Sequence, residues 1–185
     1  MTIDWDFISR HEGGCRLSGY VPAAATSQSG VTVATGVDLG QRSYRDLQNM
    51  GLPQALQAKL APYCGLRAAA AQRALAALPL SLTPEEARLL DEAAARPIFN
   101  ALRRAYDAAT APGAFDRLPD AIQTALASVA YQYGANLQKR TPRFWRAATR
   151  QDWTACILEL DDFGDAYARR RRDEAALIRR CLTTG

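Results

Sequence analysis

A change of hydrophobic period near the N-terminus constrains the fold more than any other feature of the chain. Between residues 31 and 38, three valines alternate with polar or small residues, among them Thr32 and Asp38. This alternation is typical of a half-buried strand. A straight strand would separate Thr32 from Asp38 by about 20 Å, so the chain needs a turn, which Gly36 can supply. We therefore predict a small β-hairpin in this segment.

Helical patterns surround the hairpin. Thr2 can cap a first helix in which Trp5, Ile8 and Glu12 share one face, and Gly13 with Gly14 would end it. This spacing predicts that Glu12 faces protein and not water.

After Gly40 the helical signals return. Thr83, Pro84 and Glu86 have the spacing of a capping box with proline at the first helical position, and Pro97 should kink or divide that helix. Residues 118–134 are so apolar that we predict a central buried helix ending at Gly134. Three further helices are expected within residues 140–148, 151–160 and 165–180.

The chain has the length of one domain. Its 185 residues can bury a sizeable core, and they contain no internal repeat, low-complexity tract or linker. We predict one α+β, mainly α domain over residues 1–185, with a hairpin lobe over roughly residues 1–60 and a helical lobe over residues 61–185.

Composition narrows the classes of partner. The net charge of +4 mildly favours an anionic partner, which could be nucleic acid, a phospholipid surface or the bacterial cell wall. No apolar run of about 18 residues is present, so we expect no membrane span. The N-terminus lacks the pattern of a secretory signal, so export would need another route.

The cysteine and histidine pattern does not favour a metal site. The chain has four widely spaced cysteines, no CxxC motif and one histidine, so we expect no metal and no cofactor. Sequence spacing leaves free thiols and disulfides open as alternatives.

Three polar residues around the hairpin have the chemistry of a glycosidase. A carboxyl group in partly apolar surroundings, as expected for Glu12, keeps its proton to higher pH and can act as a general acid. Glycoside hydrolysis also uses a second carboxylate or a positioned water, for which Asp38 and the hydroxyl of Thr32 are candidates. From composition alone, a helix-capping glutamate and a solvated loop aspartate are the alternative.

The order of the motifs HEGG, GYVP and SGVTVATGVDLG resembles that of the phage-lysozyme superfamily, most closely the pesticin-type domains of bacterial toxins. The resemblance implies a lysozyme-like fold in which Glu12, Thr32 and Asp38 form the catalytic set. Classical phage lysozymes carry their second carboxylate before the threonine. Here the segment GYVPAAATSQSG has no acid, which is similar to the pesticin pattern and leaves an inverting or a retaining mechanism open.

The resemblance extends over nearly the whole chain. The segment ALASVAYQYGAN is similar to the family's buried helix and places Gln132 where the substrate cleft is lined. The segment YARRRRDEAALI is similar to the closing helix, with Arg170, Arg171 and Glu174 at the matching positions. From helical spacing alone, we expect a solvated helix that pairs Arg170 with Glu174. Tyr20 is a candidate for stacking on a sugar ring, with a place in the core as the alternative.

The resemblance implies a muramidase that cuts between N-acetylmuramic acid and N-acetylglucosamine in peptidoglycan glycan strands. A wall-binding module with a decayed site and a basic module for nucleic acid are the alternatives, and the chain lacks the arginine-aromatic stripe expected of the latter. The setting would be an antibacterial toxin or effector acting in the periplasm of target bacteria, or a phage endolysin. A producing cell would then need an immunity protein as a partner.

Overall fold

The computed structural model describes residues 3–22 and 28–183. The predicted cap Thr2, and part of the turn expected at residues 26–30, lie outside these ranges. Contacts group the chain into two compact units, one of Ser9–Ala95 and one of Met1–Ile8 with Arg96–Gly185. We name them the sheet unit and the helical unit. Their boundary differs from the division expected near residue 60, and a single catalytic domain over residues 1–185 stays a prediction.

The sheet unit contains the predicted hairpin. Strands β1 (Arg16–Tyr20), β2 (Thr32–Ala34) and β3 (Val37–Asp38) form one antiparallel sheet in the order β1-β2-β3. Gly36 lies in the turn between β2 and β3 with φ of +84°, a conformation that glycine adopts without steric cost. The predicted turn is therefore confirmed. Contrary to the half-buried pattern, all three residues of β2 are buried, so both faces of this central strand are covered.

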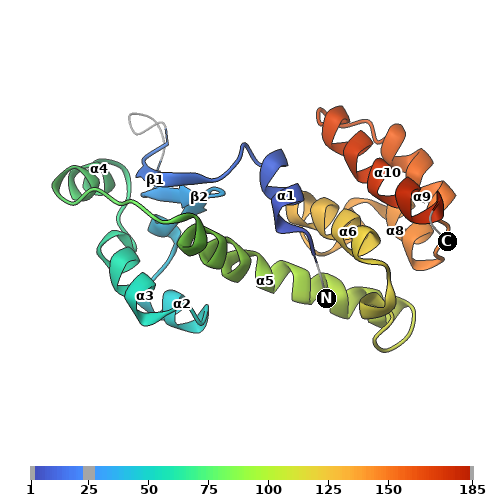
Figure 1. Cartoon of the computed structure of the whole chain (residues 1–185), viewed down its shortest axis with the longest axis horizontal. Coiled ribbons are helices and arrows are strands. Elements are labelled where there is room, and N and C mark those ends of the chain that lie inside the picture. Colours follow the sequence, from blue (N-terminus) through green and yellow to red (C-terminus); the bar gives the residue numbers. More distant parts are fainter. Residues whose placement is uncertain (1–2, 23–27, 184–185) are drawn as a thin grey trace. The chain divides into compact units, whose positions relative to one another are not determined.

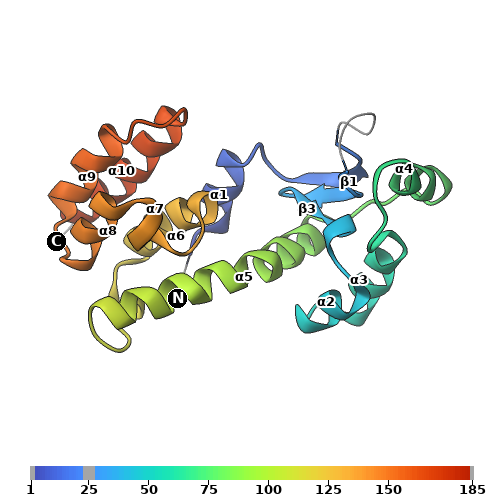
Figure 2. The ribbon, with the colours of Figure 1, turned by 180° about the vertical axis from the view of Figure 1, so that it is seen from behind.

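Short helices surround this sheet. Leu75 of α4 is a close neighbour of Gly19 on β1, and Figures 1 and 2 show these two elements side by side. The apolar core of the unit includes Val31 and Val33 of the sheet and Leu47 and Leu60 of the helices. The helical elements are η1 (Leu39–Gln41), α2 (Tyr44–Asn49), α3 (Gln54–Leu60), η2 (Ala61–Tyr63) and α4 (Ala68–Ala77).

Helix α5 (Pro84–Ala109) begins as predicted. The Thr83 hydroxyl accepts a hydrogen bond from the Glu86 backbone N–H at 3.1 Å, and the Glu86 carboxylate accepts one from the Thr83 N–H at 2.8 Å. Of the two outcomes predicted at Pro97, a kink or a division, the division does not occur, because α5 continues through the proline. Pro97 is exposed, and buried residues on both sides, Ala95 and Phe99, favour the helix enough to offset the one hydrogen bond that proline removes.

The helical unit is built around α6 (Asp120–Tyr133). Nine consecutive residues, Ile122–Ala130, are buried, and Gly134 ends the helix with φ of +84°, so the predicted central helix is confirmed. Figure 2 shows α6 with the other helices of this unit. These are α1 (Trp5–His11, in part), the part of α5 that begins at Arg96, η3 (Phe115–Arg117), α7 (Leu137–Arg140), α8 (Pro142–Thr149), α9 (Trp153–Asp161) and α10 (Ala168–Thr183).

The fold is mainly α with one small antiparallel sheet, which confirms the predicted class. Among the described residues, no helix combines the length and apolar character required to cross a bilayer. The four cysteines are free thiols, so the structure holds no disulfide among them. Burial raises the pKa of the Cys156 thiol to about 12, which keeps it protonated and unreactive.

Candidate active site

One row of side chains crosses the three strands of the sheet unit. Thr32 on β2 is paired with Tyr20 on β1 and with Asp38 on β3. Directly opposed residues of antiparallel strands project from the same face, with Cβ atoms about 4.5–5.5 Å apart. The sheet therefore brings two predicted catalytic residues and one predicted sugar-binding residue together.

Hydrogen bonds fix the Asp38 carboxylate. Its Oδ1 accepts from the backbone N–H of Gly40 at 2.8 Å and from that of Gly30 at 3.0 Å. The Thr32 hydroxyl donates to the Gly30 carbonyl oxygen at 3.3 Å. Thr32 is buried and Asp38 is half-buried. Both side chains are thus oriented by the backbone of the same glycine.

Only glycine fits at the two positions that bind Asp38. A Cβ on Gly30 would lie 2.4 Å from the Gly40 Cα and 2.6 Å from the Leu66 carbonyl oxygen. A Cβ on Gly40 would lie 2.5 Å from that same oxygen. The sequence analysis did not predict this close approach of three backbone segments, because the two glycines lie ten residues apart in the chain.

Glu12 lies just beyond the last residue of α1, His11, and is exposed. The expectation that Glu12 faces protein is therefore wrong. The helical spacing was extended one residue too far, because the chain leaves the helix into Gly13 and Gly14, both with positive φ. Trp5 and Ile8, which do lie in the helix, are buried as expected.

A buried hydrogen-bond network ties the end of α1 to the hairpin. The Thr35 hydroxyl donates to Asp91 Oδ2 at 2.8 Å, and its backbone N–H donates to Asp91 Oδ1 at 2.9 Å. The Ser9 hydroxyl lies 2.9 Å from the Thr35 hydroxyl and is the donor, since the proton of Thr35 is directed to Asp91. The network fixes the helix end that carries Glu12 relative to the turn between β2 and β3. Sequence reasoning missed all three residues, and no motif marks them.

Tyr20 is half-buried, with the guanidinium carbon of Arg16 4.4 Å from its ring centroid. A cation above an aromatic face is attracted by the ring. The cation holds the ring from one side, so a stacking sugar would use the other face or displace Arg16. Its role in sugar binding stays a prediction.

Gln132 belongs to the helical unit, where it is half-buried at the end of α6. Its Oε1 accepts a hydrogen bond from Arg171 Nη2. This contact fixes the side-chain amide and directs its oxygen to Arg171, which leaves the NH₂ group as the donor for a ligand. The expected position of Gln132 opposite Glu12 stays a prediction.

Arg171 is itself part of a buried ionic cluster. Its Nη1 lies 2.6 Å from Glu174 Oε2, and its Nε lies 3.2 Å from Asp165 Oδ2. Arg170 pairs with Glu174 at 3.2 Å, as predicted, but the expected solvated helix is wrong because all three residues of the Arg170, Arg171 and Glu174 set are buried. Burial raises the pKa of Glu174 to about 6, since the loss of water outweighs the attraction of the two arginines.

Comparison with known proteins identifies the family. A search of curated proteins finds no match to this chain. Residues 2–154, which include every element from α1 to α8, match the family described as "Pesticin: Bacterial toxin homologue of phage lysozyme, C-term". The match confirms the resemblance seen in the motifs around the hairpin and the lysozyme-like fold that it implies. The chain belongs to the pesticin family of phage-lysozyme-like bacterial toxin domains.

Proposed function

We propose that this protein is a muramidase that cleaves the β-1,4 bond between N-acetylmuramic acid and N-acetylglucosamine in peptidoglycan. The observation that carries the proposal is the row of Tyr20, Thr32 and Asp38 across the sheet, with Glu12 on a helix end tied to the same hairpin. Membership in a family of phage-lysozyme homologues supports a glycan substrate.

Glu12 is the proposed general acid. Its exposed position allows a glycan strand to approach the carboxyl group, and the bound strand would then displace water from it. In the reaction the Glu12 proton passes to the leaving glycosidic oxygen as the bond from that oxygen to the anomeric carbon breaks.

Asp38 is the proposed second carboxylate. Positive charge develops on the anomeric carbon and ring oxygen of the sugar, and an ionised carboxylate on that side of the sheet would stabilise it. The two N–H groups that hold Oδ1 keep the carboxylate in one orientation. Thr32, next to it in the row, would position a water or a sugar hydroxyl.

The separation of the two carboxyl groups in a substrate complex decides the stereochemistry. A distance of about 5 Å implies a covalent retaining route, and about 6.5–9.5 Å leaves room for water and implies inversion. Tyr20 and Gln132 are the proposed contacts to the sugar rings and the N-acetyl groups.

The proposed setting is an antibacterial toxin that acts in the periplasm of target bacteria, as the toxin description of the family supports. A cell that produces this toxin would need an immunity protein. A phage endolysin is the alternative setting and would have the same activity. With an added periplasmic signal, expression should lyse a Gram-negative host, and expression in the cytoplasm should be tolerated. Equal toxicity in both compartments would contradict a wall substrate.

Mass spectrometry of purified peptidoglycan after incubation tests the activity. Reducing-end muropeptides indicate a hydrolase, anhydro-muropeptides indicate a transglycosylase, and intact sacculi with bound protein indicate a binding module.

Glu12→Gln should remove nearly all activity, because an amide has no labile proton to donate, and Thr32→Ala should reduce activity by less. Glu85→Gln, at another exposed glutamate of the sheet unit, is the matched control. If Glu12→Gln releases muropeptides at the wild-type rate, the proposed mechanism is wrong.

A further inference from the structure

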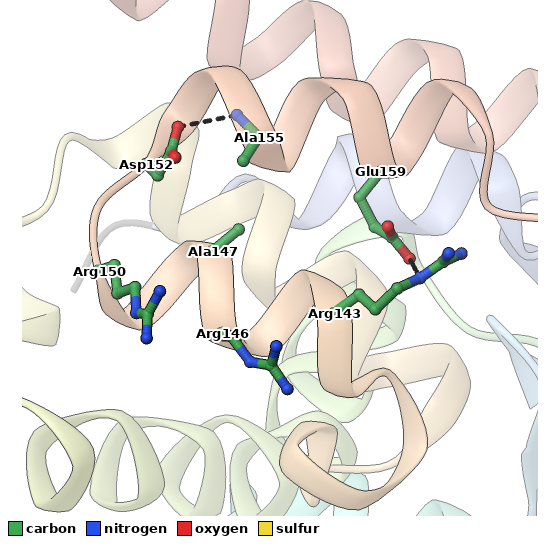
Figure 3. Close-up of a pocket in the computed structure, with 7 residues that line it drawn as sticks. All are labelled: Arg143, Arg146, Ala147, Arg150, Asp152, Ala155 and Glu159. Carbon is green, nitrogen blue, oxygen red and sulfur yellow. Dashed lines mark hydrogen bonds and ion pairs between the residues drawn. The ribbon is translucent and has the colours of Figure 1, made fainter.

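A pocket of about 230 Å³ opens between α8 and α9 in the helical unit (Figure 3). None of the residues proposed for glycan cleavage belongs to it. Three arginines dominate its wall, with two acidic and two small residues beside them. The lining residues are Arg143, Arg146, Ala147, Arg150, Asp152, Ala155 and Glu159.

Packing on the opposite side of α8 holds the arginines at the surface. Phe144, Trp145 and Ala148 of this helix are buried. The Tyr106 hydroxyl donates to the Ala148 carbonyl oxygen at 3.1 Å, and the rings of Tyr106 and Trp145 meet edge to face at 6.0 Å. These contacts fix the rotation of α8 about its axis. Arg143 and Arg146 therefore project from the exposed face of α8, and Arg150, which caps the end of this helix four residues after Arg146, is exposed as well.

Two of the three arginines have no partner among the described residues. Arg143 Nε donates to Glu159 Oε1 at 3.0 Å. The Asp152 carboxylate accepts from the Ala155 N–H at 2.9 Å and so caps α9. The guanidinium groups of Arg146 and Arg150 make no hydrogen bond or ion pair within the part of the chain that the structure describes, and Figure 3 shows both groups at the pocket without such a contact.

Arg146 of α8 and Arg150, the C-cap residue of that helix, are four residues apart, so their like charges repel each other. An anion between them would remove the repulsion and bind to both. A carboxylate has two oxygens in one plane, and a single guanidinium can satisfy both of them. A terminal phosphate has three free oxygens in a tetrahedral arrangement, which suits two guanidinium groups that approach from different directions.

We propose that the pocket between α8 and α9 binds a phosphate monoester, held by Arg146 and Arg150. The volume of the pocket leaves room for a phosphate group together with part of the molecule that carries it. The same group occurs on free metabolites and on lipid headgroups. The proposal is independent of the glycan-cleaving site, which involves none of these residues.

Calorimetric titration of the whole chain with inorganic phosphate and with phenyl phosphate, at low salt, tests the site. Saturable binding by the wild type should weaken about tenfold or more in the double variant Arg146→Gln/Arg150→Gln, because hydrogen bonds between charged groups are lost. The double variant Arg104→Gln/Arg169→Gln removes the same charge from two other exposed arginines of the helical unit and should bind normally. Circular dichroism checks that each variant is folded.

Further binding experiments identify the kind of molecule that carries the phosphate group and the chemical class of the ligand. Sedimentation with phosphatidylcholine vesicles that contain phosphatidic acid, but not with pure phosphatidylcholine, would assign the site to a lipid headgroup. Binding of the soluble phosphates alone would assign it to a free phosphate monoester. The proposal is overturned if neither phosphate source binds, if both double variants lose binding equally, or if acetate binds as tightly. Preferential binding of polyglutamate would also overturn it and would assign the pocket to an acidic protein.

Discussion

Substitution of Asp38 can separate its structural role from its proposed catalytic role. Asp38→Ala removes the acceptor for two backbone N–H groups, those of Gly30 and Gly40. Hydrogen bonds to charged groups each contribute about 1.5–3 kcal/mol, and the half-buried position favours the lower value, so the alanine variant should lose about 3 kcal/mol of unfolding free energy. Asp38→Asn retains an oxygen that can accept from both groups and should lose about 1 kcal/mol or less.

Activity should follow a different order from stability. The side chain introduced by Asp38→Asn carries no negative charge, so this variant should cleave peptidoglycan very slowly although it is folded. Urea unfolding followed by circular dichroism gives the stability, and release of muropeptides gives the rate. An asparagine variant with wild-type activity would refute the catalytic role. An alanine variant as stable as the wild type would refute the structural reasoning.

Three further predictions test the surroundings of the site. Gly40→Ala should destabilise the protein by about 1–3 kcal/mol or more and reduce activity, because the new Cβ would lie 2.5 Å from the Leu66 carbonyl oxygen. The comparison variant is Gly36→Ala, whose new Cβ has no neighbour within 4 Å. It has only a positive φ to accommodate, so it should lower the free energy of unfolding in urea by about 1–2 kcal/mol. Gln132→Ala should weaken activity, chiefly by raising KM, without unfolding the protein. Substitution of the exposed Gln138 by alanine is its control. An unchanged KM in Gln132→Ala would show that Gln132 is not part of the substrate site. Because the folded-state pKa of Glu174 is raised from 4.5 to about 6, its contribution to the unfolding free energy should be full well below pH 4.5 and should fall by about 2 kcal/mol in total as pH rises through 6 to about 7. Urea unfolding of wild type and Glu174→Gln across this range should show that difference, and parallel stability curves would contradict it.

Local sequence rules predicted the features that depend on neighbouring residues. The turn at Gly36, the capping box of Thr83 and Glu86, and the end of α6 at Gly134 all follow from contacts within a few positions of the chain. The pairing of Arg170 with Glu174 follows in the same way from helical spacing.

The features that sequence reasoning missed depend on tertiary contacts. Spacing within α10 cannot show that Ser128 and the backbone of α6 cover Arg170, which donates to the Ser128 carbonyl oxygen at 2.9 Å. In the same way, no local sequence pattern predicts the two hydrogen bonds between Thr35 and Asp91, which are 56 positions apart in the chain. Glu12 was misplaced for a different reason, since the helical period was applied beyond the last helical residue.

The hydrogen bonds around the hairpin give Asp38 and Thr32 a structural role that is separate from their proposed role in catalysis. Asp38 and Thr32 both bind Gly30 and would be needed for the hairpin even in a protein that only binds the wall. Without Glu12, these two residues therefore do not distinguish an enzyme from a decayed site, and the proposed function depends on the three residues together. Glu12 lies just outside α1 at an exposed position, which a glycan strand can reach. Glu12→Gln is thus the substitution that best separates the two functions, because it should abolish cleavage in an enzyme and leave wall binding by a non-catalytic module unchanged.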